Sequence, residues 1–303
     1  MTEVPACAVP GLTPATLGEW LLWAKDELGF LGEGEALDET VYLAREAFET
    51  GRAELTLHGS GVPDPEKAER FRTFILKRKQ RIPAAYVCGR AYFRDETLTV
   101  DPACLIPRPE TELLVEALVR CGGFEYTEPL TFLDLGTGSG AIAVSVLRHF
   151  ERSRGVLSDL SPEVLEIARG NVAAYGLTAR AEFAVSDLFG AFGGRRWKVI
   201  LSNPPYVKRA DLERLDEEVR SEPRLALDGG DDGLEFYRRI LREASEHLTA
   251  KGKILLELGA GQAGPVRAMM EARGFKGIRI FRDHASIERV IMGESKEGVG
   301  DKR

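Results

Sequence analysis

The sequence predicts an α/β protein in which a small helical domain precedes a doubly wound, mostly parallel sheet of seven expected strands. Two observations carry this prediction. From Thr131 onward, short apolar runs typical of strands alternate with longer helical stretches, which indicates parallel strands joined by covering helices. Ahead of Ile82-Pro83, apolar residues recur only at helical spacing. A length of 303 residues suits two domains of this kind.

The helical domain is expected to span residues 1–82. Acidic helix starts are expected at residues 38–40 and 64–66, where Asp precedes the next apolar stretch. Gly29, Gly51 and the stretch 59–63 supply the stops between helices. Such a domain, separate from the sheet, is expected to recognise a protein substrate.

A linker over residues 83–107 is expected to contain a β-hairpin, because short alternating runs occur at Tyr92-Phe93 and at residues 98–100. The sheet domain then spans residues 108–293, and residues 294–303 read as a tail. The expected strands are residues 131–135, 156–159, 182–185, 199–202, 253–258, 277–281 and 287–292. The expected helices between them are residues 141–150, 162–175, 234–248 and 262–273.

Only the turn at residues 282–286 separates the last two strands, so they should pair antiparallel at one edge of the sheet. A doubly wound sheet that ends in such a hairpin is typical of the Rossmann-like methyltransferase architecture.

Composition narrows the function. The net charge is −7, from 41 basic and 48 acidic residues, which disfavours bare nucleic acid as the main partner. No apolar run approaches the roughly 18 residues that a membrane span needs. No basic residue precedes an apolar stretch at the N-terminus, so we expect a cytoplasmic protein. The four cysteines (Cys7, Cys88, Cys104, Cys121) and four histidines (His58, His149, His247, His284) lack metal-ligand spacing, so no metal is expected.

A glycine-rich turn follows the first strand of the sheet, in the run Gly136-Thr137-Gly138-Ser139-Gly140. Glycines let the backbone turn tightly and let a ligand approach main-chain N–H groups. Asp159 closes the next strand, where its carboxylate could accept both hydroxyl protons of a ribose. We therefore expect an adenosine-type cofactor here, although the glycines alone fit a nicotinamide enzyme and an S-adenosylmethionine enzyme equally well.

A second motif, Asn203-Pro204-Pro205-Tyr206, ends the fourth strand at the carboxyl edge of the sheet, where ligands of such folds bind. Two prolines fix the backbone and leave the Pro204 carbonyl available to a donor. The Asn203 amide adds an acceptor, and Tyr206 adds a ring face. Together these groups suit a planar NH₂ group with its nitrogen lone pair directed outward.

These motifs resemble those of the amino-methyltransferases, which modify exocyclic or amide nitrogens. Three further segments resemble the release-factor glutamine methyltransferase family, PrmC/HemK, over nearly the whole chain. They are residues 81–86 (Arg-Ile-Pro-Ala-Ala-Tyr, with Gly89 and Phe93), residues 105–112 (Leu-Ile-Pro-Arg-Pro-Glu-Thr-Glu) and residues 222–234 (Glu-Pro-Arg-Leu-Ala-Leu-Asp-Gly-Gly-Asp-Asp-Gly-Leu).

The resemblance implies transfer of a methyl group from S-adenosylmethionine to the side-chain amide nitrogen (N5) of a glutamine, in the Gly-Gly-Gln motif of class I peptide chain release factors. It implies cofactor contacts from residues 136–140, Asp159, residues 186–188 (Ser186, Asp187, Leu188) and Asn203. It implies that residues 203–206 hold the glutamine, with Asn203, Pro204 and Tyr206 as catalytic residues, and that Leu105 packs on the substrate. Leu188 stands where some relatives carry an aromatic residue. Leu105 reads equally well as hinge packing.

Three other functions stay open from the sequence. A sister enzyme acting on a ribosomal-protein glutamine would share the loop and the fold. An adenine-N6 methyltransferase would share Asn-Pro-Pro-Tyr, although the acidic balance disfavours it. A non-catalytic module that binds S-adenosylmethionine is the third, and the intact motif at residues 203–206 argues against it. We expect a monomer that contacts neither nucleic acid nor membrane.

Overall fold

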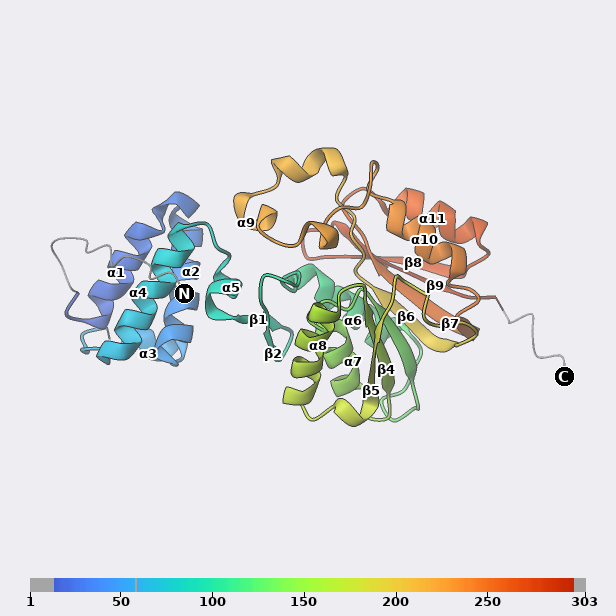
Figure 1. Ribbon diagram of the computed structural model, residues 1–303, viewed down its shortest axis with the longest axis horizontal. Coiled ribbons are helices and arrows are strands. Elements are labelled where there is room, and N and C mark those ends of the chain that lie inside the picture. The colour runs from blue at the N-terminus through green and yellow to red at the C-terminus, as the bar shows by residue number, and fades with distance from the viewer. Residues whose placement is uncertain (1–13, 58, 297–303) are drawn as a thin grey trace. The chain divides into compact units, whose positions relative to one another are not determined.

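The structure is a computed structural model that describes residues 14–57 and 59–296. The chain forms two compact units, Met1–Cys88 and Gly89–Arg303 (Figure 1). Cys7, His58 and residues 297–303 of the expected tail lie outside the described residues. In the part of the chain that is described, no helix is both long enough and apolar enough to cross a membrane.

The first unit is a helical bundle, as the sequence predicts. Its elements are α1 (Leu17–Glu27), η1 (Gly29–Leu31), α2 (Glu33–Phe48), α3 (Arg52–Leu57), α4 (Pro65–Lys79) and α5 (Ala84–Cys88). Asp64 caps α4 through its side chain, as expected, and Pro65 occupies the first turn. The expected start at residues 38–40 is wrong, because α2 already begins at Glu33, directly after Gly32 with its φ of 87°.

Apolar side chains from all the longer helices of this unit form one core. Leu43 of α2 and the pair Phe71 and Ile75 of α4 are fully buried in it, and Trp20 of α1 packs edge-on against Phe71. Val87 of the short helix α5 belongs to the same core. The unit therefore has its own hydrophobic interior, as an independent domain requires.

The second unit opens with the predicted hairpin, β1 (Arg90–Phe93) paired antiparallel with β2 (Glu96–Thr99). Helix α6 (Pro109–Cys121) follows, and the sequence had not predicted it. The prolines at 107 and 109 read as an extended segment, but Pro109 occupies the first turn of α6. A missing N–H costs nothing there, so Pro109 starts the helix and does not prevent it.

The main sheet has seven strands in the order β5-β4-β3-β6-β7-β9-β8. They are β3 (Thr131–Leu135), β4 (Arg154–Asp159), β5 (Ala181–Val185), β6 (Trp197–Ser202), β7 (Leu248–Glu257), β8 (Lys276–Arg282) and β9 (Glu288–Glu294). The strands β3 to β7 are parallel to one another, whereas β9 pairs antiparallel with both β7 and β8. The predicted fold, a mostly parallel sheet with an antiparallel edge hairpin, is confirmed.

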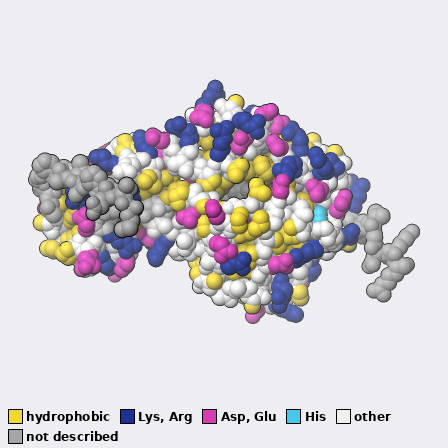
Figure 2. Space-filling model, in the orientation of Figure 1, with side chains coloured by type: hydrophobic (Ala, Val, Ile, Leu, Met, Phe, Trp, Pro, Cys, Tyr) yellow, Lys and Arg dark blue, Asp and Glu magenta, His cyan; other side chains and the backbone are white. Residues whose placement is uncertain are grey.

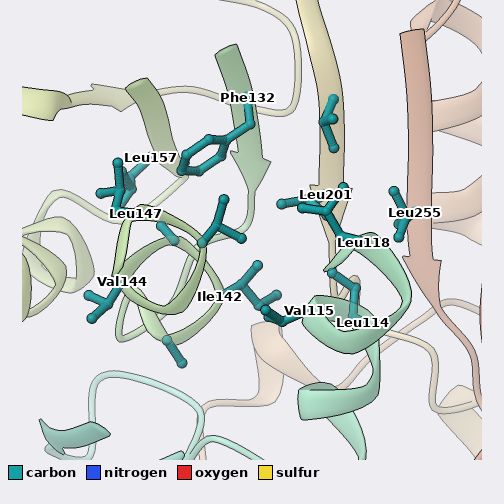
Figure 3. Close-up of a cluster of buried hydrophobic side chains, with 14 of the residues drawn as sticks. Leu114, Val115, Leu118, Phe132, Ile142, Val144, Leu147, Leu157, Leu201 and Leu255 are labelled. Carbon is teal, nitrogen blue, oxygen red and sulfur yellow. The ribbon is translucent and has the colours of Figure 1, made fainter. Parts of the chain in front are cut away.

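Helices cover both faces of this sheet. On one face lie α6, α7 (Ala141–His149) and α8 (Pro162–Ala174), and on the other lie α10 (Glu235–Glu243) and α11 (Ala263–Ala272). Figure 3 shows Leu114 of α6 and Ile142 of α7 among the apolar side chains that pack against Phe132, Leu201 and other strand residues. Burial of this apolar surface is the main stabilising contribution that the fold makes.

The expected end of one helix is wrong. The pattern suggested a helix over residues 234–248, but α10 ends at Glu243. Strand β7 begins at Leu248, whose side chain is buried and whose backbone pairs with Trp197 of β6. Because Leu248 pairs with the neighbouring strand, it cannot belong to the helix that the local apolar spacing suggests. Short helical turns complete the unit: η2 (Thr178–Arg180), η3 (Arg209–Arg214), α9 (Glu217–Arg220) and η4 (Arg224–Ala226).

Candidate active site

A cavity of about 800 Å³ opens where the strands β3, β4 and β6 reach their carboxyl ends. Its wall comes from residues 102–111, the loops after these strands and the segment 223–226. Figure 2 shows hydrophobic side chains gathered across the middle of the Gly89–Arg303 unit, between α9 and α8. The cavity thus lies at the carboxyl ends of the parallel strands, where α/β sheets bind their ligands.

The glycine turn after β3 forms the floor of this cavity. Gly136 and Gly138 have φ angles of 66° and 56°, in the left-handed region that favours glycine. A Cβ built on either residue would meet no heavy atom within 4 Å, so both face open space. Thr137 and Ser139 line the cavity between them. Gly140 is not among the lining residues; it is the N-cap of α7, and a Cβ on it would lie 3.2 Å from Ala168 of α8.

Asp134 of β3 supports this turn through a hydrogen bond, and the sequence pattern had not indicated it as a site residue. Its Oδ2 accepts a hydrogen bond from the Thr137 hydroxyl at 2.6 Å. Complete burial raises the pKa of Asp134 to about 7. Its other oxygen has no hydrogen-bond partner among the described residues. An aspartate inside an otherwise apolar strand was the signal that could have found it.

Asp159 ends β4 beside the same turn and is half-buried at the cavity wall. Its Oδ2 accepts the Gly138 N–H at 3.1 Å, and its Oδ1 accepts the Ser161 N–H at 3.2 Å. Burial raises the pKa of this carboxyl, while three backbone N–H groups, those of Ser161, Gly138 and Leu160, oppose that rise. Each oxygen has lone-pair capacity beyond these bonds, so the carboxylate can also accept hydroxyl protons from a ligand.

The loop after β5 supplies the far wall of the cavity. Leu188 has a φ of 50°, a left-handed conformation that is unusual for a leucine. The Ser186 hydroxyl holds it there by donating to the Leu188 carbonyl at 2.7 Å. Asp187 pairs with Arg239 of α10 at 2.6 Å, and both line the cavity. Phe236 of α10 is the aromatic side chain in the lining, which the sequence had not indicated.

The Asn203-Pro204-Pro205-Tyr206 segment leaves β6 at the opposite wall. Asn203, Pro204 and Pro205 line the cavity, and the Asn203 Nδ2 donates to the hydroxyl of Thr111 at 3.1 Å. Tyr206 does not line the cavity. Its hydroxyl lies 3.5 Å from a carboxylate oxygen of Glu257, and burial raises its pKa to about 12.

The backbone at Tyr206 is held by its neighbours in the fold. Gln262 donates to the Tyr206 carbonyl at 3.0 Å, and the same amide donates to the carbonyl of Gly233. A Cβ on Gly233 would lie 2.5 Å from the Tyr206 carbonyl oxygen, and one on Gly229 would lie 2.7 Å from its Cα. Only glycine therefore allows the 229–233 loop to pass so close to the motif.

Leu105 and the exposed Leu225 both line the cavity, and an acidic side chain holds the segment of Leu105 in place. The buried Glu222 accepts the Ile106 N–H at 3.0 Å and forms an ion pair with Arg108. Glu222 precedes the segment 223–226, so it links two segments of the cavity wall. Glu222 is the first residue of the 222–234 segment, and nothing in the sequence pattern indicated this contact.

The fold and this cavity define the class of protein. Residues 109–222 match the family model described as "Methyltransferase small domain", and residues 19–89 match the "PrmC N-terminal domain". A solved methyltransferase from Pyrococcus furiosus is similar to the chain with a TM-score of 0.50 and 18% identity, covering 66% of this chain and 88% of that one. The chain is a methyltransferase.

Named relatives with similar sequences show the family to which the chain belongs. A release factor glutamine methyltransferase from Cereibacter sphaeroides is 39% identical over 270 residues, covering 88% of this chain and 94% of the relative. Another from Geobacter sulfurreducens is 36% identical over 279 residues, covering 92% and 96%. The chain belongs to the release factor glutamine methyltransferase family.

Proposed function

We propose that this enzyme methylates N5 of the glutamine in the Gly-Gly-Gln motif of class I peptide chain release factors, with S-adenosylmethionine as methyl donor. The observation that carries the proposal is the meeting of two features in one cavity. An open glycine turn beside Asp159 suits the donor, and the Asn203 amide with the Pro204 carbonyl suits a primary amide. Family membership supports the choice of a release factor as substrate.

The residues around the glycine turn fit S-adenosylmethionine. Gly136 and Gly138 leave room for the methionine part, and Asp159 would accept the ribose hydroxyl protons. Residues 186–188 would flank the adenine, with Phe236 near them in the same lining. When bound, this cofactor supplies a methyl group on a sulfonium, an electrophile that a neutral nitrogen can attack.

The protein's task is to make an amide nitrogen nucleophilic. The lone pair of an amide is delocalised into its carbonyl, so the nitrogen reacts poorly in solution. If the Asn203 oxygen and the Pro204 carbonyl each accept one N–H, they direct the lone pair toward the methyl group and disfavour planarity. Orientation of this kind can contribute on the order of 7–11 kcal/mol. The same acceptors stabilise the positive charge that develops on the nitrogen.

The product nitrogen must lose one proton after transfer. We infer that water removes it, because the four residues of the Asn203 to Tyr206 motif include no carboxylate or imidazole that could act as a base. The helical domain, in this proposal, recognises the release factor outside the cavity, while the sheet domain binds the cofactor and the glutamine.

The test is a labelling experiment with methyl-labelled S-adenosylmethionine. Purified release factor, ribosomal proteins and DNA are offered separately, and a release factor with Gly-Gly-Ala in place of Gly-Gly-Gln serves as matched control. We expect label in the intact release factor alone, with fragment mass spectrometry assigning it to the glutamine side chain. Label in a ribosomal protein or in DNA, with an unlabelled release factor, would contradict the proposal.

A further inference from the structure

Asn171 of α8 is a buried polar side chain that the proposed mechanism does not use. It is 2% exposed, and its Nδ2 donates to the Ser139 carbonyl at 2.8 Å and to the Thr99 carbonyl at 2.9 Å. Its Oδ1 accepts the Thr99 N–H at 2.7 Å. These three hydrogen bonds use both amide protons and the amide oxygen, so they fix the orientation of the side chain.

The two partners of Asn171 belong to different parts of the cavity wall. Ser139 is part of the glycine turn and lines the cavity. Thr99 ends β2, and the segment 102–105, which also lines the cavity, begins three residues later. One side chain therefore joins the turn that is proposed to hold the methyl donor to the segment that is proposed to face the glutamine.

Helix α8 packs closely enough against the glycine turn to bring Asn171 to it. A Cβ built on Gly140 would lie 3.2 Å from the Ala168 Cβ, so the helix lies against the end of the turn at this point. Asn171 follows Ala168 by three residues and therefore lies on the same face of the helix. The same helix also contacts β2 (Figure 1).

A second side chain holds the same edge of β2. The hydroxyl of Tyr175, the residue directly after α8, accepts the Thr97 N–H at 2.7 Å and donates to the Thr97 carbonyl at 3.1 Å. Alternate residues of an edge strand direct their N–H and C=O groups away from the paired strand, and Thr97 and Thr99 are such a pair. Among the residues that the structure describes, Asn171 and Tyr175 thus hold β2 alike, but of the two only Asn171 also hydrogen-bonds the glycine turn.

We propose that Asn171 is a positioning residue that holds the glycine turn and the segment 102–105 at a fixed spacing, so that the donor methyl group and the substrate amide meet in the correct geometry. The proposal rests on the proposed function for what these two parts of the wall bind. It concerns a separate property, the hydrogen-bonded link between them. A displacement of about 1 Å between reacting groups can cost on the order of 100-fold in rate.

The first experiment compares Asn171→Ala with Tyr175→Phe, using a Gly-Gly-Gln peptide. Asn171→Ala releases both the turn and the hairpin, so we expect kcat to fall by about 10- to 100-fold. Cofactor affinity should fall by about 3- to 10-fold, which corresponds to one net hydrogen bond. Tyr175→Phe is the matched control, because it keeps the ring and frees the hairpin only at Thr97. It should leave cofactor affinity unchanged and kcat within about threefold of the wild type.

The second experiment needs no substitution. NMR follows hydrogen exchange at backbone amides of the wild-type enzyme, with and without S-adenosylhomocysteine as probe. Exchange at the Thr99 N–H requires its bond to Asn171 to open, and a ligand that orders the turn at Ser139 should make this opening rarer. We expect exchange at Thr99 to slow by about 3- to 10-fold, since the coupling between two sites is reciprocal. Thr97 is the internal reference and should slow by less than about twofold.

The outcomes separate this proposal from the proposed function. Equal effects of Asn171→Ala and Tyr175→Phe on kcat and cofactor affinity would mean that Asn171 only holds the hairpin, and would overturn the proposal. Wild-type kinetics in Asn171→Ala, or an equal response of Thr97 and Thr99 to the probe, would overturn it as well. Should Asn171→Ala not fold, the exchange measurement on the wild type decides alone.

Two results concern the proposed function. A release factor that stays unlabelled, while Thr99 responds to the probe and Thr97 does not, would contradict only the proposed function. If calorimetry shows that S-adenosylhomocysteine does not bind, both proposals fail together.

Discussion

Asn203 is the residue on which the proposed chemistry depends most. Its oxygen is proposed to accept one substrate N–H, an interaction that matters most in the transition state. Asn203→Ala should therefore lower kcat by about 100- to 1000-fold, equivalent to about 2.7–4 kcal/mol, while cofactor affinity stays nearly unchanged. Steady-state kinetics with a Gly-Gly-Gln peptide and calorimetry with the cofactor measure the two effects. A near-normal kcat in this variant would contradict the proposed mechanism, although the family assignment would still hold.

Tyr206 serves as a comparison for that variant. Tyr206→Phe keeps the ring and removes the hydroxyl that lies 3.5 Å from Glu257, so we expect only a mild effect. Tyr206→Ala removes the ring as well and leaves the loop that carries Asn203 and Pro204 less well packed, so kcat should fall further than in Tyr206→Phe. Equal effects of the two substitutions would mean that the hydroxyl, and not the ring, carries the role of Tyr206.

Asp159 tests the cofactor end of the cavity. Asp159→Ala should weaken S-adenosylmethionine binding, because a hydrogen bond to a charged group is worth about 1.5–3 kcal/mol and two to the ribose would be lost. Calorimetry checks this, with Asp211→Ala as a control carboxylate outside the cavity lining. The sequence predicts no affinity for NAD. An unchanged cofactor affinity in Asp159→Ala would show that Asp159 does not contact the cofactor.

The motif residues could be predicted from the sequence because their chemistry follows from adjacent positions. Residues 136–139 and 203–205 all line one cavity, as strand-end placement predicts. Thr111 could not be found in this way, since its hydrogen bond with Asn203 depends on how α6 packs against the sheet. Tyr206 is the last residue of the motif, but the fold directs its hydroxyl toward Glu257 and not into the cavity.

At the scale of the elements, the strands were the most predictable part of the chain. The run at residues 131–135 matches β3 at both ends, because a buried strand between turn residues has a short, continuous apolar signal. Helix α6 was missed since its N-terminal proline looked like a helix breaker, and α10 was drawn too long because sheet pairing begins at Leu248. A local sequence pattern does not show whether a residue between a helix and a strand belongs to the helix or to the strand.

The cavity mouth depends on the link that Glu222 makes between two segments. Glu222→Gln should weaken the pair with Arg108 while keeping the side chain's shape, so the segments 105–108 and 223–226 should hold each other less firmly. We expect a several-fold higher KM for the peptide, an estimate based on the loss of about 1 kcal/mol of charge-assisted bonding. Cofactor affinity should not change. A variant with wild-type KM would show that the mouth keeps its form without this ion pair.

At the scale of the whole molecule, two buried carboxyls of the sheet unit make stability depend on pH. Burial raises the pKa of both Asp134 and Glu257 to about 7, from ordinary values of 3.8 and 4.5. The folded state therefore binds more protons than the unfolded state between about pH 4 and 7, and stability is lost as pH rises through 7. We expect the Tm to fall between pH 5 and pH 8, measured by calorimetry, and to fall less in Glu257→Gln. An equal drop in both proteins would mean that Glu257 is already ionised when folded at pH 5.

The division of the chain into two units leads to the last prediction. The helical unit has its own core, and every residue that lines the cavity belongs to the Gly89–Arg303 unit. If the helical unit recognises the release factor, a chain that begins at Gly89 should bind S-adenosylmethionine nearly as well as the full chain. It should also methylate a short Gly-Gly-Gln peptide at a comparable rate, but methylate the intact release factor much more slowly. Circular dichroism and cofactor calorimetry first establish that the shortened chain is folded. The peptide and the whole factor present the same glutamine to the cavity. An equal loss of methylation rate on both substrates would therefore indicate damage to the sheet unit. An unchanged methylation rate on both substrates would show that the helical unit has no part in recognition.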